Sequence, residues 1–146
     1  FCRIYKERKD KKNFIFLRTK YSYAVLNIYP YNSGHVLVIP QRHIKKLSQL
    51  KPEERQDLFD LLDEVTALLE QCLNPGGFNI GMYYGRAAGA GCPNHRHIHI
   101  VPRWKGDANF MPVVGQTKVM SVSLKALYDL LTDSSSLRLY HQDLNV

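Results

Sequence analysis

The chain has 146 residues, of which 45% are hydrophobic and 23% are charged, and its formal net charge is +7. This composition is typical of a globular domain, and no run of about 18 apolar residues predicts a membrane span. Three cysteines form no even disulfide framework, which favours a reducing compartment and a cytoplasmic location. The basic balance suits an anionic partner. Many cations lie in residues 3–12 without the interleaved aromatics of a base-stacking platform. We interpret that segment as a solvated hairpin or loop, with RNA binding as a weaker alternative, and do not expect nucleic acid as a partner.

The predicted elements follow in chain order. Runs rich in β-branched and aromatic residues, bounded by turn-forming residues, predict five strands at 13–19, 23–29, 35–39, 78–83 and 95–101. Between the third and fourth strands, leucine and valine recur with a 3.6-residue period and predict a helix over 52–73. Pro52 suits its first position, and Glu53 and Glu54 suit its positively polarised first turn. A short strand is expected at 118–122 and a short helix at 123–131.

The order of these elements predicts an α+β domain. Strands in runs with segregated helices indicate an antiparallel five-stranded sheet, covered on one face by one long and one short helix. We expect a single domain over residues 1–146, in which residues 132–146 form a poorly defined tail.

Three histidines at alternate positions mark the most informative strand. His95, His97 and His99 would share one face, with Ile98 and Ile100 on the other, because successive side chains of a strand point to opposite sides. A glycine-rich loop at residues 85–91 leads into this strand. The proline that follows it is expected to end it.

Metal binding, a structural role and catalysis are all possible uses of these histidines. A strand of this length separates the first and last by about 13 Å, whereas zinc–nitrogen bonds are only about 2.0–2.1 Å. One ion therefore cannot take all three, and a metal site would need ligands from elsewhere. Single histidines are often satisfied core residues, but three in register beside a glycine loop are a poor fit to that interpretation. A neutral imidazole is a competent nucleophile, its neighbours can donate protons, and a glycine loop lets backbone N–H groups approach a phosphate.

This strand also resembles a family signature. The run His95-Arg-His97-Ile-His99-Ile-Val is similar to that of the histidine triad (HIT) superfamily, in which three histidines alternate with apolar residues. Residues 33–40, Ser-Gly-His-Val-Leu-Val-Ile-Pro, resemble its nucleotide-binding strand, and residues 102–112 resemble the branch of diadenosine polyphosphate hydrolases and phosphorylases. The resemblance runs from about residue 2 to residue 118. It implies a homodimer, a nucleotide substrate and no required cofactor.

The resemblance also implies roles for individual residues. His97 would attack the α-phosphorus and form a nucleotidyl-histidine, His99 would bond the phosphate or the leaving oxygen, and His95 and His35 would support the site. The nucleotide would be bound by a further set of residues, Asn27, Leu26, Gly89, Ala90 and Gly91, with Ile4 as a second wall of the base pocket.

Some positions depart from the family pattern. Arg96 stands where an apolar residue is usual, so we expect the outer face of this strand to meet solvent or a partner. Ala90 and Gly91 replace a frequent polar residue after the loop glycine, and Tyr83 replaces a frequent Asn. Backbone N–H groups would then replace side chains as the donors to the phosphate. This change bears on the rate of the reaction and not on the identity of the nucleophile.

A structural zinc site is a weaker expectation. Some HIT proteins carry an N-terminal Cys-x-x-Cys that joins two histidines around zinc, and Cys2 is similar to the second cysteine of that motif. His43 and His95 are the matching histidines. Three ligands leave a tetrahedral structural site incomplete.

The sequence therefore predicts an enzyme, a nucleotidyl hydrolase or transferase that acts on nucleoside polyphosphates such as diadenosine tetraphosphate through a covalent intermediate on His97. The alternative is a nucleotide-binding module with vestigial catalysis, since Ala90 and Tyr83 remove expected polar groups.

Overall fold

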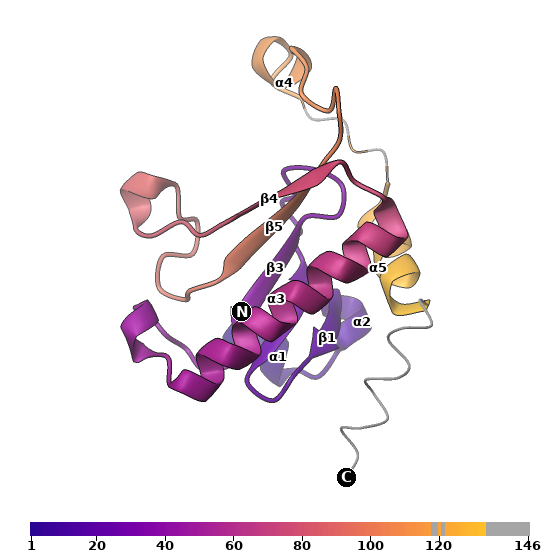
Figure 1. Ribbon diagram of the computed structural model, residues 1–146. Coiled ribbons are helices and arrows are strands. Elements are labelled where there is room, and N and C mark those ends of the chain that lie inside the picture. The colour runs from indigo at the N-terminus through magenta and orange to yellow at the C-terminus, as the bar shows by residue number, and fades with distance from the viewer. Residues whose placement is uncertain (118–119, 121, 134–146) are drawn as a thin grey trace.

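The computed structural model describes residues 1–117, 120 and 122–133. Its centre is one antiparallel sheet with the strand order β1-β2-β3-β5-β4. The strands are β1 Ile15–Arg18, β2 Ser22–Leu26, β3 Val36–Pro40, β4 Gly77–Gly81 and β5 Ile98–Arg103. The predicted α+β class and five-stranded antiparallel sheet are confirmed. Because β5 lies between β3 and β4, the strand that carries the last of the three histidines is internal to the sheet (Figure 1).

The strand boundaries differ from the predicted ones. β5 begins only after His97, and it does not stop at Pro102 as predicted but continues to Arg103. Its pairing with β3 covers only Ile98–Ile100, so Pro102 lies where β5 has one neighbouring strand, a setting in which proline is tolerated. The strand expected at 118–122 falls largely outside the described residues, as does the tail after residue 133.

The two predicted helices are confirmed and cover one face of the sheet. They are α3 Pro52–Leu73 and α5 Leu124–Asp133, and Figure 1 shows α3 running across the strands. The Glu54 carboxylate accepts the Lys51 N–H at 2.8 Å, which satisfies a free donor at the start of α3. The leucines and valine of α3 pack with the inward residues of all five strands into the main core. No helix within the described residues is both long and apolar enough to span a bilayer.

The N-terminal segment is helical, so its interpretation as a hairpin or loop was wrong. It forms two short helices, α1 Cys2–Lys6 and α2 Asp10–Asn13. Ile4 and Tyr5 of α1 pack on the second face of the sheet, over a smaller cluster made by Ile15, Tyr23, Val25, Leu37 and Ile39. Arg18 holds the segment in place, because its guanidinium donates to Asp10 at 2.8 and 2.6 Å and lies 4.5 Å from the Tyr5 ring centroid. The second face, expected to be open, is therefore covered over β1 to β3.

The remaining helices are short and lie in connections. They are the 3-10 helices η1 Leu47–Gln49 and η2 Arg86–Ala88 and the single turn α4 Met111–Val114. Figure 1 shows α4 standing away from the sheet.

Candidate active site

The site lies on the second face of the sheet, where cover by α1 ends. His99 on β5 pairs with Leu37 of β3 and with Gly81 of β4. It lies on the face opposite to Ile98 and Ile100, which pack into the main core. Within β5, His99 and the two isoleucines therefore lie on opposite faces of the sheet, as predicted. His95 and His97 precede the strand, yet the rings of His97 and His99 still lie 4.8 Å apart between centroids.

The backbone fixes the tautomer of His97. Its Nδ1 lies 2.8 Å from the carbonyl oxygen of His95. A carbonyl only accepts hydrogen bonds, so we assign the proton of the neutral ring to Nδ1. The Nε2 lone pair is therefore the free end of the imidazole, as a nucleophile requires.

His35 and His99 form a chain of hydrogen bonds that begins at a backbone amide. The Tyr31 N–H donates to His35 Nδ1 at 2.9 Å, so the His35 proton must lie on Nε2. That Nε2 lies 2.9 Å from His99 Nδ1, which therefore accepts. The remaining proton of neutral His99 lies on Nε2, and this buried nitrogen bonds to no described residue. His99 thus presents one N–H donor beside His97.

Burial keeps these rings neutral. His97 and His99 are 9% and 8% exposed. Desolvation lowers the pKa of His97, and it lowers the pKa of His99 to about 4 with help from the neighbouring His97. At neutral pH both rings are therefore uncharged, so His97 is free to attack and His99 still carries a proton to donate.

A pocket of about 570 Å³ opens beside His97, between α1 and β2. We call it the His97 pocket. Leu26 and Ile4 line it, as the resemblance implies, and so do Asn27 and the unanticipated Phe1. Asn27 accepts the Tyr29 N–H through Oδ1, and its Nδ2 lies 3.4 Å from His35. Two cations, Arg3 and Lys12, stand among the lining residues and make the pocket attractive to an anion.

The glycine-rich loop contributes less to this pocket than expected. Gly91 and the exposed Cys92 line it. The N–H groups of Gly89 and Ala90 donate inside the loop, to the carbonyls of Arg86 and Gly85. These two N–H groups are therefore engaged within the loop, whereas Gly91 lies at the pocket wall.

Arg96 is buried, so the expectation that it meets solvent or a partner was wrong. It is 6% exposed, and its guanidinium donates to three backbone carbonyls, those of Lys45, Tyr83 and Pro93. Its charge also lies 4.2 Å from the centroid of the Tyr84 ring. Arg96 therefore connects the segment that follows β3, at Lys45, to the segment that follows β4, at Tyr83. Lys45 and Tyr83 are distant from Arg96 in the sequence, so no local pattern indicates these two partners.

Two tyrosines complete the surroundings of His99. The Tyr31 ring stacks on it at 5.8 Å and 7°, and the Tyr83 ring lies 4.9 Å away. Burial and a hydrogen bond with Tyr83 raise the pKa of Tyr31 to about 12, so its hydroxyl stays protonated. No sequence pattern indicates the role of Tyr31, since its stacking depends on the turn that brings β3 back along β2.

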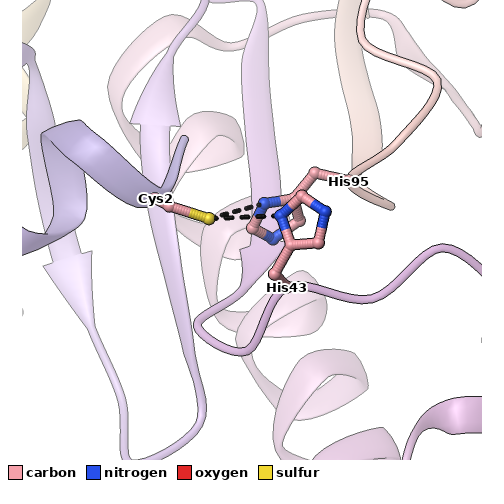
Figure 2. A group of neighbouring side chains, drawn as sticks. All are labelled: Cys2, His43 and His95. Carbon is pink, nitrogen blue, oxygen red and sulfur yellow. Dashed lines mark hydrogen bonds between the residues drawn. The ribbon is translucent and has the colours of Figure 1, made fainter.

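Beside the triad, Cys2, His43 and His95 form a second cluster. Figure 2 shows the Cys2 thiol directed at both rings, with Sγ–Nδ1 distances of 3.3 Å to His43 and 3.4 Å to His95. His95 Nε2 lies 2.9 Å from the Pro40 carbonyl, so its proton is there and its Nδ1 lone pair faces Cys2. The three possible ligand atoms lie within 4.8 Å of one another, as a metal ion requires. The first histidine of the triad therefore belongs to this cluster.

We predict that His99 titrates far below an ordinary histidine. Its ring resonances in an NMR titration, identified by their loss in His99→Asn, should have a midpoint near pH 4. The unfolded value is about 6.5, so between these pH values the unfolded chain binds the extra proton. His99 therefore makes folding less stable as the pH falls through this window. A midpoint at 6.5 or above would contradict the burial argument.

Comparisons with known proteins agree with this geometry. The HIT domain model matches residues 8–106. An AP-4-A phosphorylase of Mycobacterium tuberculosis is 38% identical over 122 residues, which are 84% of this chain and 63% of that protein. An asymmetrical bis(5'-nucleosyl)-tetraphosphatase of Schizosaccharomyces pombe is 44% identical over 93 residues, which are 64% of this chain and 50% of that protein.

The fold has a close solved counterpart. The crystal structure of a Zn-bound histidine triad family protein from Mycobacterium smegmatis superimposes with a TM-score of 0.74 and 24% identity, over 98% of this chain and 95% of that one. The chain spans less than two thirds of the length of the two sequence relatives above. With three alternating histidines, the expected sheet and a domain model matched over most of its length, this chain belongs to the HIT domain family.

Proposed function

We propose that this chain is a nucleotidyl hydrolase or transferase that acts on diadenosine polyphosphates through a covalent intermediate on His97. The single observation that carries the proposal is the orientation of two neutral imidazoles. His97 Nε2 is left as a free lone pair, and His99 Nε2 is left as a free donor 4.8 Å away between ring centroids. The names of the two relatives, a phosphorylase and a tetraphosphatase, support the substrate class.

The first step follows from this orientation. His97 Nε2 attacks the α-phosphorus, a new N–P bond forms, and the bond from phosphorus to the bridging oxygen breaks. The electron pair leaves with that oxygen, which His99 Nε2–H stabilises by donation. The His95 carbonyl, which accepts from His97 Nδ1–H at 2.8 Å, stabilises the charge that the ring acquires.

In the second step, water or inorganic phosphate attacks the same phosphorus, and the N–P bond breaks. The electron pair of the N–P bond returns to His97 Nε2, and the proton of the incoming water or phosphate passes to the departing polyphosphate or to solvent, while His99 Nε2–H again donates to the phosphate. His97 then returns to its neutral form. Water as the acceptor makes the chain a hydrolase, and phosphate makes it a phosphorylase.

The His97 pocket suits the nucleoside that remains bound. Leu26 and Ile4 offer apolar walls for a base, and Asn27 offers an amide for a ribose hydroxyl. Gly91 lines the same pocket, and we expect its backbone to approach the phosphate. Arg3 and Lys12 raise the local concentration of an anionic substrate, and they take no part in the chemical steps.

We predict that His97→Gly abolishes turnover, with a loss in kcat of about 10,000-fold or more, because it removes the group that would carry the nucleotide. The assay is a panel of diadenosine polyphosphates and adenosine phosphoramidate, with and without inorganic phosphate, read by mass spectrometry. His99→Asn is the matched control: it retains the nucleophile and should still give a nucleotidyl adduct on the protein, more slowly.

Two results separate this proposal from its rival. An unchanged rate in His97→Gly would refute the covalent mechanism. Tight nucleotide binding by the unmodified chain, with no product from any member of the panel, would instead support a binding module with vestigial catalysis.

We also propose that Cys2, His43 and His95 hold a zinc ion. A tetrahedral zinc with normal bond lengths separates sulfur from nitrogen by about 3.6 Å, and the observed separations are 3.3 and 3.4 Å. The Pro40 carbonyl already orients His95 as a ligand, which is the usual second partner of a metal-bound histidine. The ion would stabilise the fold at this point, and the proposed reaction takes no step through it.

We predict that one zinc ion per chain is retained after dialysis and raises the melting temperature, measured by mass spectrometry of the metal and by calorimetry. Cys2→Ser should weaken zinc binding by at least about 10-fold, since it removes the thiolate. Cys72→Ser, a half-buried thiol on α3, is the control and should bind zinc normally. Equal affinities in both variants would exclude this cluster as the site.

We further propose that two copies of the chain pair through β4. This strand is one edge of the sheet, its Ile80 is 48% exposed, and Phe59 of α3 is 55% exposed. An open edge strand with exposed apolar residues readily pairs with another strand.

Light scattering should therefore show a dimer, and Ile80→Lys should shift it toward the monomer. Leu130→Lys on α5, a residue that is 43% exposed, is the matched control and should remain dimeric. A monomer in the unmodified chain would contradict the proposal.

A further inference from the structure

A second pocket lies on the other side of His99. It has a volume of about 530 Å³, and its floor is formed by Asn79 and Gly81 of β4 with Val101 of β5. Its outer wall comes from residues 107–112, in the segment that follows β5. We call it the β4–β5 pocket. It adjoins the His97 pocket, because His99 and the two tyrosines beside it, Tyr31 and Tyr83, line both.

We propose that the β4–β5 pocket binds the nucleoside of the leaving half of a dinucleoside polyphosphate. This inference rests on the proposed function, and it adds the place where the second nucleoside is recognised. The chemical class it takes is a base with its ribose, at the far end of the departing phosphate chain.

The direction of the reaction points to this pocket. His97 lines the His97 pocket and does not line the second one, whereas His99 lines both. In phosphoryl transfer the entering and leaving atoms lie roughly in line, on opposite sides of the phosphorus. A group displaced by His97 therefore leaves on the side of His99, toward the β4–β5 pocket.

His99 also connects the two pockets chemically. Its Nε2–H is buried and bonds to no described residue, so a donor is left unused between the pockets. A buried donor without a partner costs free energy unless a ligand satisfies it. The bridging oxygen of a substrate that spans both pockets would supply the missing acceptor.

The charges in the β4–β5 pocket favour a nucleoside over a phosphate. Its cation, Arg103, donates to both carboxylate oxygens of Asp107 at 2.7 Å, and Asn32 donates to the same carboxylate at 2.8 Å. Arg103 holds the pKa of Asp107 well below its usual range, so the pair stays ionised and balanced. The pocket thus has no spare positive charge for a polyphosphate, which contrasts with Arg3 and Lys12 at the other pocket.

The lining of the pocket matches the two kinds of surface on a base. Apolar and aromatic residues line it from several elements, among them Val101, Pro112 and the two tyrosines, Tyr31 and Tyr83. Asn79 supplies a polar group, because its Oδ1 accepts from Arg103 at 2.8 Å and its amide N–H₂ bonds to no described residue. Flat apolar walls with one oriented amide suit a ring that has apolar faces and a hydrogen-bonding edge.

The test compares two substrates that share the scissile bond. Diadenosine tetraphosphate has a second nucleoside and adenosine 5'-tetraphosphate has none, so the ratio of their kcat/KM values measures recognition of the leaving nucleoside. Gly81→Phe should lower this ratio by about 10-fold or more. Gly81 pairs with His99 on the neighbouring strand, so a side chain at position 81 would point to the same face of the sheet as His99, into the pocket. An added Cβ there meets nothing within 4 Å.

Gly77→Phe is the matched control. It makes the same change on the same strand, also with nothing within 4 Å of an added Cβ, but Gly77 does not line the pocket. Its ratio should equal that of the unmodified chain. Ala108→Phe fills the pocket from the outer wall and repeats the test if Gly81→Phe does not fold. Light scattering shows whether each variant keeps the oligomeric state of the unmodified chain.

The outcomes separate this inference from the proposed function. If the unmodified chain cleaves neither substrate, the proposed function fails and this inference fails with it. If it cleaves both substrates equally well, or if the folded filled variants keep its ratio, the second nucleoside is not bound here and only this inference falls. A fall in the ratio confined to Gly81→Phe and Ala108→Phe supports it.

Discussion

The chemistry of this protein depends on hydrogen bonds between backbone groups and imidazole rings. A neutral histidine has one donor and one acceptor nitrogen, and its neighbours decide which is which. Here the His95 carbonyl takes the proton of His97, and the Tyr31 amide begins the chain that passes through His35 to His99. Backbone groups do not titrate in the physiological range. The fold itself therefore determines which nitrogen of His97 carries a free lone pair and which nitrogen of His99 carries a proton, at any pH at which the rings are neutral.

The sheet supplies both the burial and the positions that this arrangement requires. β5 has neighbours on both sides at His99, which leaves that ring 8% exposed and lowers its pKa. His35 enters β3 directly after Gly34, whose φ of +75° is open mainly to glycine. A Cβ there would lie 2.5 Å from Leu73 of α3. The glycine thus lets the turn approach the long helix closely, which brings His35 against His99.

The elements that depend on the spacing of neighbouring residues were predicted correctly from the sequence, and those that depend on distant contacts were not. The helix α3 and the five strands follow from the spacing of residues. The N-terminal helices did not, because α1 is held by the distant Arg18 and by packing on the sheet. Arg96 was misplaced for the same reason: its three carbonyl partners include Lys45 and Tyr83, which lie far from it in the sequence. A charged residue on a strand appears exposed until its partners are known.

His95 contacts both the proposed metal cluster and His97, the first through its ring and the second through its backbone carbonyl. Its ring is held between the Pro40 carbonyl and the Cys2 thiol, while its own carbonyl orients His97. Phe1 is the N-cap of the short helix that carries Cys2, and its ring lies 4.8 Å from that of His97. Fixing Cys2 against His95 therefore fixes the peptide that sets the tautomer of His97 and one wall of its pocket. A metal at this cluster would act on catalysis only through position, which explains how it can lie beside the triad without sharing the reacting nitrogen.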